Sequence, residues 1–383
     1  MTPENIATYI RQKIEERKTK NAFRSLSVEN NLVDFCSNDY LGFARSKELA
    51  EKTHADLMRL TGNVNGSTGA RTITGTSKLT LEVEKMLANY HCAEAALIYN
   101  SGYNANLGLF SALPYRGDTI LYDELIHASI RDGISLSRAN AWSFRHSDLE
   151  HLEKRLQLAK GKIYVAIEAI YSMDGDAAPL KEIALLCKKY KAALIVDEAH
   201  SNGLYGKKGE GMVCDLGLEK DVFCRVMTFG KALGCHGAAI VGSADLKDFL
   251  INFSRPFIYT TAPSQHQLLA AKNAYDKLSE LNFKNHKIST LCNLFKLKIQ
   301  SISNVELIPS NSSIQCVILP GNDFVKHVCN EIQKAGFDVR PIVAPTVPEG
   351  KERIRICFHA FNSEEEVLGL VDALKNSLSK TNK

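Results

Sequence analysis

Short apolar runs that recur between residues 95 and 242 constrain the fold more than any other feature of the sequence. Each run suits one strand, and the amphipathic stretches between the runs are long enough for helices. This alternation is typical of a mostly parallel sheet with helices on both faces, so we predict an α/β fold. The runs are Ala95–Tyr99, Thr119–Tyr122, Ala141–Phe144, Ile163–Glu168, Ala192–Asp197, Val222–Thr228 and Ala238–Gly242.

The pattern changes after residue 265. A long helical stretch is followed by apolar runs at Ser313–Leu319, Asp338–Pro341 and Arg353–Phe358, with helical stretches between and after them. This arrangement predicts a small α+β domain at the C-terminal side of the chain.

The N-terminal segment has its own pattern. Ile6, Ile10 and Ile14 recur at helical spacing and predict a helix, and Val33–Cys36 predicts a short strand. A chain of 383 residues usually forms two domains. We expect three parts: residues 1–45, which pack with the small domain; residues 46–285, the large α/β domain; and residues 286–383, the small α+β domain.

Composition and charge exclude several classes of protein. Hydrophobic residues make up 45% of the chain, enough for a buried core, and the net charge of +4 comes from dispersed residues, so no nucleic-acid partner is expected. No apolar run reaches the roughly 18 residues of a membrane span, so we expect no membrane partner. The 10 cysteines show no C-x-x-C spacing. They predict reduced core thiols in a cytoplasmic protein, with no metal site.

Polar residues follow two of the predicted strands. Asp197-Glu198-Ala199-His200 comes after the run that ends at Asp197, where open α/β sheets bind ligands. The tetrapeptide also suggests a helicase-like NTPase, which requires a phosphate loop. The one candidate, Gly69–Lys78, has the wrong spacing and no lysine after its second glycine.

Lys231 lies between two glycines in Thr228–Gly234, just past the next strand. An Asp and a Lys at neighbouring strand ends can face one ligand, and pyridoxal 5'-phosphate needs both. The lysine forms a Schiff base, and the carboxylate keeps the pyridine nitrogen protonated. Asn100–Asn104 opens a helix that can bind the phosphate, assisted by Ser101, and His127 can stack on the ring.

Together these residues resemble the α-oxoamine synthases, fold-type I pyridoxal-phosphate enzymes that join an amino acid to an acyl-CoA with loss of CO₂. The resemblance extends essentially from end to end of the chain. Its segments are Ser37–Gly42, Ser101–Asn106, Ser172–Asp176, Asp197–His200, Thr228–Lys231, Pro345–Pro348 and Arg353–Arg355.

The resemblance implies a role for each matching residue. Lys231 holds the cofactor, Asp197 contacts the ring nitrogen, His127 stacks on the ring and His200 contacts the ring hydroxyl. A homodimer with shared active sites is also implied, in which Thr261 of one subunit reaches the phosphate in the other. The remaining implied cofactor residues are Ser101, Gly102, Tyr103, Glu168, Ser172 and Thr228.

The implied substrates are an amino acid and an acyl-CoA or acyl carrier protein. We expect L-alanine and a pimeloyl thioester, as in biotin biosynthesis, with glycine and acetyl-CoA as the alternative. A catalytically silent scaffold and the NTPase remain the alternatives from other classes. The implied substrate-binding residues are Arg24, Asn38, Arg340, Thr346 and Arg355.

Three positions depart from the family pattern. Thr80 replaces an expected histidine, and Asn202 replaces a usual threonine after the acidic tetrapeptide. The tripeptide Ile342–Ala344 lengthens the segment after Arg340, which weakens the assignment of Arg340 to carboxylate binding.

Overall fold

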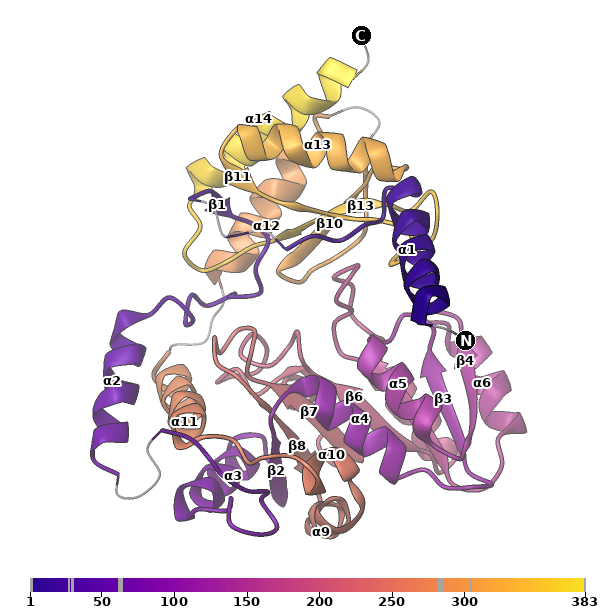
Figure 1. Ribbon diagram of the computed structural model, residues 1–383, viewed down its shortest axis with the longest axis vertical. Coiled ribbons are helices and arrows are strands. Elements are labelled where there is room, and N and C mark those ends of the chain that lie inside the picture. Colours follow the sequence, from indigo (N-terminus) through magenta and orange to yellow (C-terminus); the bar gives the residue numbers. More distant parts are fainter. Residues whose placement is uncertain are drawn as a thin grey trace. The chain divides into compact units, whose positions relative to one another are not determined.

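The computed structural model describes residues 3–26, 28, 31–60, 65–281, 286–302 and 305–381. The chain divides into two units. Unit 1 consists of Met1–Ser37, Met173–Asp176 and His286–Lys383, and unit 2 consists of Asn38–Ser172 and Ala177–Asn285. In Figure 1, unit 1 includes the indigo N-terminal helix and the yellow C-terminal helix.

Unit 2 is built on a seven-stranded sheet with the strand order β2-β8-β7-β6-β5-β3-β4. Strand β8 is antiparallel to both of its neighbours, and the other pairs are parallel. The predicted mostly parallel sheet is therefore confirmed. The strands are β2 (Ala95–Tyr99), β3 (Thr119–Asp123), β4 (Asn140–Phe144), β5 (Ile163–Glu168), β6 (Ala193–Asp197), β7 (Cys224–Thr228) and β8 (Ala238–Gly242).

Helices cover both faces of this sheet, which explains why its strands are continuous apolar runs. On one face, α4, α5, α9 and α10 pack on side chains such as Ile195 and Val226. On the other face, α6 and α7 cover one half of the sheet, and α3 and α11 cover the other half. The helices of unit 2 are α2 (Lys47–Met58), α3 (Lys78–Tyr90), α4 (Gly102–Ala112), α5 (Ala128–Leu136), α6 (Leu149–Leu158), α7 (Leu180–Lys189), α8 (Met212–Asp215), α9 (Ala244–Phe253), α10 (Arg255–Ile258) and α11 (Gln265–Glu280).

Unit 1 contains a four-stranded antiparallel sheet with the order β12-β13-β10-β9 and a parallel pair of strands, β1 and β11. Helix α14 packs against α12 and α13. This α+β arrangement follows the prediction. The elements are α1 (Pro3–Thr19), β1 (Val33–Asp34), α12 (His286–Ile299), β9 (Glu306–Leu307), β10 (Ile314–Ile318), α13 (Asn322–Lys334), β11 (Phe337–Asp338), β12 (Arg340–Ile342), β13 (Arg353–Cys357) and α14 (Glu364–Thr381).

The predicted strand Asp338–Pro341 is wrong in one respect, because it is divided between two sheets. Strand β11 pairs with β1, whereas β12 pairs with β13. Val339, between the two strands, is fully buried. A single run of sequence thus serves two sheets, which the apolar pattern alone does not reveal.

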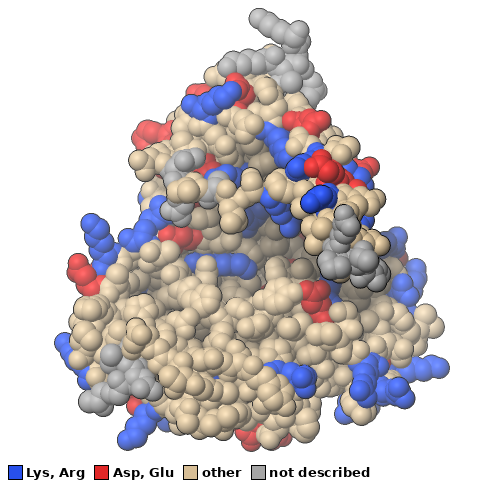
Figure 2. Space-filling model, in the orientation of Figure 1, with Lys and Arg blue, Asp and Glu red and all other residues tan. Residues whose placement is uncertain are grey.

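On the face drawn in Figure 2, blue Lys and Arg side chains and red Asp and Glu side chains are scattered around a broad tan area of other residues. Among the described residues, no helix combines the length and apolar character needed to cross a bilayer. The prediction of core cysteines is only partly right. Cys92 is exposed, and Cys36, Cys214 and Cys235 are half-buried, because these four lie in turns, loops and a short helix rather than on buried strand or helix faces.

Candidate active site

A cavity of about 280 Å³ lies at the carboxyl ends of the parallel strands of unit 2. Strands β5, β6 and β7 each end in a residue that lines it, namely Glu168, Asp197 and Thr228. Open α/β sheets bind ligands at this edge. The other lining residues are Asn38, Ser101, Gly102, Tyr103, Asn106, His127, Ser129, Ala199, Gly230, Lys231, His236 and Gly237.

Asp197 is 5% exposed and is held from two sides. The backbone N–H of Ala199 donates to Oδ1 at 2.9 Å, and Asn106 Nδ2 donates to Oδ2 at 2.7 Å. These neutral donors fix the direction of the carboxylate without supplying a positive charge. Asp197 is thus oriented toward a ligand in the cavity.

Glu168 is a second buried acid, in register with Asp197 on the neighbouring strand. Its Oε1 is buried without a hydrogen-bond partner among the described residues. Burial raises the pKa of Glu168, the charge of Asp197 raises it further, and Lys231 opposes the shift. Two adjacent buried carboxyls disfavour a second negative charge, so the protonated form of Glu168 is favoured.

His127 caps the N-terminus of α5, and its Nδ1 accepts from the backbone N–H of Ser129 at 3.2 Å. The Ser129 hydroxyl lies 2.7 Å from the same nitrogen. Burial lowers the pKa of His127 and Lys231 lowers it too, against the opposing effect of Asp197. An uncharged imidazole with its ring fixed by the helix cap therefore lines the cavity.

Lys231 is half-buried and lines the same cavity, three residues beyond the end of β7. The turn that follows is fixed by Gly234, which has a φ of 59° and would place a Cβ 2.1 Å from the backbone nitrogen of Ala44. A side chain at this position is excluded, so the glycine serves the packing of the lysine loop.

Helix α4 begins at the cavity. Ser101 Oγ accepts from the backbone N–H of Asn104 at 3.1 Å, which leaves its hydroxyl hydrogen available to a ligand. A Cβ on Gly102 would lie 2.6 Å from the methyl of Thr228, so only glycine fits at this position. The helix N-terminus and Thr228 therefore lie against each other and offer N–H and hydroxyl donors to an anion. Tyr103 donates a hydrogen bond to Asp132.

Three predicted cofactor residues are not among the residues that line the cavity. His200 is buried, with its Nδ1 2.8 Å from the hydroxyl of Tyr40. Ser172 donates its backbone N–H to Glu168 and so acts on the second acid. Thr261 is exposed, and its carbonyl accepts from Asn100 Nδ2 at 2.8 Å. Its predicted contact with a second subunit remains a prediction.

Unit 1 holds the predicted substrate residues other than Asn38. Arg24 donates to the hydroxyl of Thr346 at 3.2 Å. Arg340 and Arg355 are directly opposite each other on β12 and β13. Arg340 also pairs with Asp338 at 2.9 Å. Opposed residues of an antiparallel pair share one face, so the two cations lie close together and favour an anion beside them.

Sequence reasoning gave no role to Asn106, although it bonds directly to Asp197. Asn106 is 2% exposed on α4, among Ala105, Gly108 and Leu109. A polar residue within the apolar face of that helix is the signal that would have identified it. Ser129 and His236 also line the cavity, and no pattern in the sequence pointed to them.

The segment Gly69–Lys78 has none of the features of a phosphate loop. Ser77 and Thr80 form a reciprocal capping box at the start of α3, which gives Thr80 a structural role. A Cβ on Gly75 would lie 2.6 Å from the Gly69 carbonyl oxygen, so this glycine packs within its own loop. The NTPase alternative therefore lacks its phosphate site.

Comparison with known proteins agrees with this geometry. The model of the family "Aminotransferase class I and II" matches residues 30–374. The chain is 36% identical to the 8-amino-7-oxononanoate synthase of Emericella nidulans, over 100% of this chain and 98% of the relative. The chain belongs to this aminotransferase family. Within the family it is an α-oxoamine synthase, a pyridoxal-phosphate-dependent acyltransferase.

Solved structures show the same relationship. A serine palmitoyltransferase of Sphingomonas wittichii superposes with a TM-score of 0.89 at 27% identity, covering 98% of this chain and 97% of that one. The 8-amino-7-oxononanoate synthase of Francisella tularensis gives a TM-score of 0.80 at 25% identity, covering 93% and 100%. The fold-type I architecture is thus established for this α-oxoamine synthase.

The cofactor of the enzyme is pyridoxal 5'-phosphate, and the cavity fits it. The cavity offers an amine on Lys231, a carboxylate on Asp197 and the N-terminus of α4 at the Gly102 contact. Two residues that line the cavity also carry buried polar atoms with no hydrogen-bond partner among the described residues, Glu168 Oε1 and Asn106 Oδ1. An amine, a carboxylate and an anion cradle are the groups that bind the aldehyde, ring nitrogen and phosphate of this cofactor.

Proposed function

We propose that the enzyme condenses L-alanine with a pimeloyl thioester to form 8-amino-7-oxononanoate, CO₂ and the thiol, a step of biotin biosynthesis. The observation that carries the proposal is the identity of 36% with a relative of that name over the whole chain. The acyl group is carried by CoA or by an acyl carrier protein. The proposed enzyme works as a homodimer in the cytoplasm, and Thr261 contributes to the partner's site.

The residues of unit 2 would hold the cofactor. Lys231 would hold it covalently, Asp197 would bind its ring nitrogen, and the N-terminus of α4 with Thr228 would bind its phosphate. His127 would stack on the ring and His200 would contact the ring hydroxyl. When bound, the cofactor supplies an electron-poor ring that stabilises negative charge on the substrate Cα.

The protein's own residues would transfer a proton and hold a negative charge in a fixed position. Once the amino group of the substrate has replaced Lys231 on the cofactor, the freed amine Nζ would take the proton from Cα of the amino acid. Asp197 stays fixed by Asn106 and Ala199, so its negative charge is directed at the ring nitrogen without reorganisation. Uncharged His127 adds no positive charge that would compete for Asp197.

The carboxylate groups of the substrates require cations. Arg355 and Arg340 face each other across two strands, and a guanidinium binds carboxylate in bidentate fashion. We assign Arg340 and Arg355 together to the carboxylate of the amino acid. We assign Arg24, with Thr346, to the distal carboxylate of the pimeloyl chain, and Asn38 to the substrate side of the cavity.

The proposal is tested by thiol release from the cofactor-loaded protein. Alanine, glycine and serine are each combined with pimeloyl-, acetyl-, succinyl- and palmitoyl-CoA. We expect release chiefly with alanine and pimeloyl-CoA. Release chiefly with glycine and acetyl-CoA, or with serine and palmitoyl-CoA as the Sphingomonas wittichii structure suggests, would overturn the substrate assignment and leave the site intact.

A pair of variants tests the distal carboxylate assignment. With Arg24→Gln, we expect KM for pimeloyl-CoA to rise while KM for alanine stays unchanged. The matched control is Arg17→Gln, an exposed arginine on α1. Equal effects of the two substitutions would contradict the role of Arg24.

A further inference from the structure

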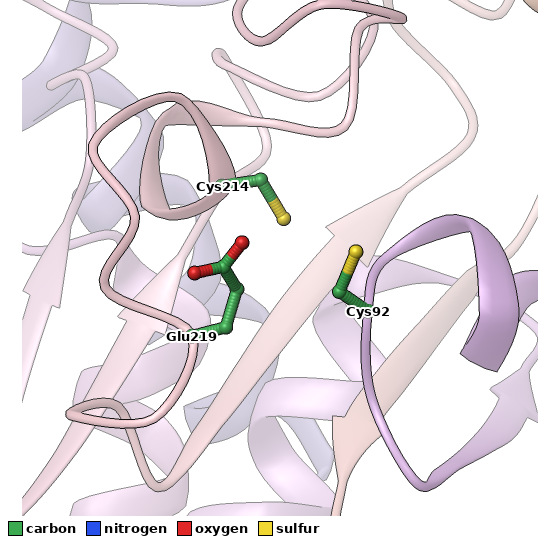
Figure 3. A group of neighbouring side chains, drawn as sticks. All are labelled: Cys92, Cys214 and Glu219. Atoms are coloured by element: carbon green, nitrogen blue, oxygen red, sulfur yellow. The ribbon is translucent and has the colours of Figure 1, made fainter.

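Three side chains with metal-binding atoms converge outside the active site. Cys92 follows α3, Cys214 belongs to α8, and Glu219 lies in the segment that leads to β7. Their ligand atoms all lie within 4.8 Å of one another. Figure 3 shows the three side chains pointing toward a common centre. We propose that Cys92, Cys214 and Glu219 bind a soft divalent cation of the Zn²⁺ class.

The donor set and its spacing suit this class of ion. Zn²⁺ takes Cys sulfur at about 2.3 Å and carboxylate oxygen at about 2.0–2.2 Å in a tetrahedron, which requires neighbouring ligand atoms roughly 3.5–4 Å apart. In the cluster the ligand atoms all lie within 4.8 Å of one another, close to that spacing. Thiolates disfavour Mg²⁺ and Ca²⁺, which prefer oxygen ligands, so the two sulfurs select for a softer metal.

A buried arginine donates a hydrogen bond to one sulfur of the cluster. Arg225 Nη1 donates to Cys214 Sγ at 3.1 Å, and the Arg225 side chain is 4% exposed. Two thiolates and a carboxylate carry one negative charge more than a divalent cation neutralises. Arg225 also pairs with Glu198 at 3.7 Å, so its guanidinium serves both Glu198 and Cys214. Hydrogen bonds from such outer partners orient metal ligands.

The remaining coordination position is accessible to solvent. A cavity of about 790 Å³ is lined by Cys92, Glu219 and Arg225, together with the acidic residues Glu94 and Asp221. It gives a cation a route to the Cys92 sulfur and the Glu219 carboxylate, with room for a water as fourth ligand, and Lys220 also lines it. Cys92 itself has a φ of 52°, a left-handed conformation that favours Gly or Asn, and this conformation sets the direction of its side chain.

The cluster is separate from the active site. Within the described part of the chain, no residue lines both cavities. Strand β7 begins at Cys224 beside the cluster and ends at Thr228 in the active site, roughly 13 Å away at 3.3 Å per residue. The bound metal would join the end of α3 to α8 and to the segment before β7. Its role is therefore structural, and catalysis proceeds without it.

The test uses the cofactor-loaded protein, kept reduced by a phosphine. Zn²⁺ affinity is measured by competition with a chromophoric chelator, and the site is probed with Co²⁺. We expect one tightly bound metal per chain, a sulfur-to-Co²⁺ charge-transfer band, and loss of at least about tenfold in affinity in both Cys92→Ser and Cys214→Ser. The matched control is Cys36→Ser, which alters a half-buried cysteine of unit 1 and should bind as the wild type does.

Two results would overturn the proposal: a Co²⁺ spectrum without a sulfur-to-metal band, or Zn²⁺ affinity that is equal in Cys92→Ser and the wild type. Because Cys92 is exposed, its substitution by serine leaves the fold intact, and a far-ultraviolet circular dichroism spectrum checks this. Any metal bound by the active site or its cofactor should remain bound in every variant. It can therefore be distinguished from metal at the proposed site, which the cysteine variants should lose.

Discussion

Asp197 and Glu198 are consecutive acids at the end of one buried strand, yet their surroundings are opposite. Successive side chains of a strand point to opposite faces of the sheet. Asp197 points toward α4 and receives bonds from an amide and a backbone N–H. Glu198 points toward α8, where its Oε2 accepts from the Met212 N–H at 2.5 Å and the Ser201 hydroxyl at 2.6 Å.

The difference lies in the cationic partner. Glu198 has a buried guanidinium 3.7 Å away on Arg225, within the protein itself. Asp197 has a cavity on its open side, which Lys231 also lines. Glu198 is thus paired with a cation within the protein, whereas Asp197 faces a cavity. Substitution of Asp197 should therefore mainly lower the catalytic rate, and substitution of Glu198 should mainly lower the free energy of unfolding.

Of these substitutions, Lys231→Ala should have the largest effect on catalytic activity. Removal of the amine eliminates the proposed base and the covalent link to the cofactor, so we expect thiol release to fall by about 10³-fold or more. The measurement is single-turnover thiol release, with the unfolding midpoint as a control that should hardly change. Thiol release within tenfold of the wild-type rate would refute the lysine assignment.

Asp197→Asn should follow, with a loss of about 10²–10³-fold in kcat, because a neutral amide would no longer stabilise the protonated ring nitrogen that Asp197 is proposed to bind. The substrate KM should change little. The amide oxygen still accepts from Ala199, whereas the bond from Asn106 is lost, so the free energy of unfolding should fall by about 1–2 kcal/mol. A large loss of stability with normal turnover would reverse our distinction between the two acids.

Glu198→Gln should produce the opposite result. It leaves the charge of Arg225 buried without its counter-ion, so we expect a loss of about 3 kcal/mol in the free energy of unfolding of the cofactor-free protein. Denaturant titration followed by circular dichroism measures this loss. Asp197→Asn is the matched control, and equal destabilisation by both substitutions would contradict the comparison.

The free energy of unfolding should also depend on pH through His91, which lies near Arg225, the partner of Glu198. Burial lowers the pKa of His91 to about 3, and the charge of Arg225 acts in the same direction. The unfolded chain takes up this proton below about pH 6.5, whereas the folded chain does not until about pH 3. Stability from His91 is therefore present above pH 6.5 and is lost as the pH falls. We expect a loss of about 2 kcal/mol by pH 5 from this residue.

His91→Gln is the variant that isolates this loss. His91 is hydrogen-bonded to the Glu210 carbonyl at 3.0 Å and to the Tyr275 hydroxyl at 2.9 Å, and glutamine offers both a donor and an acceptor there. The measurement is the free energy of unfolding from pH 7.5 to pH 5. Parallel curves for variant and wild type would show that His91 does not titrate as inferred.

The sequence determined the architecture and the main cavity residues, because both depend on local patterns. Apolar runs require burial on two faces, and polar residues directly after such runs must lie at one edge of the sheet. Asp197, Lys231 and His127 were found in this way, and the structure places all three around one cavity.

Only the tertiary structure decided which neighbours complete these residues. Asn106 is 91 residues from Asp197, and Arg225 is 27 residues from Glu198, so no spacing in the sequence connects them. Cys92 and Cys214 came together in the same way, at a corner where α3, α8 and the approach to β7 meet. Local sequence fixes periodicity and strand ends, whereas contacts between distant side chains follow from the packing of helices on the sheet.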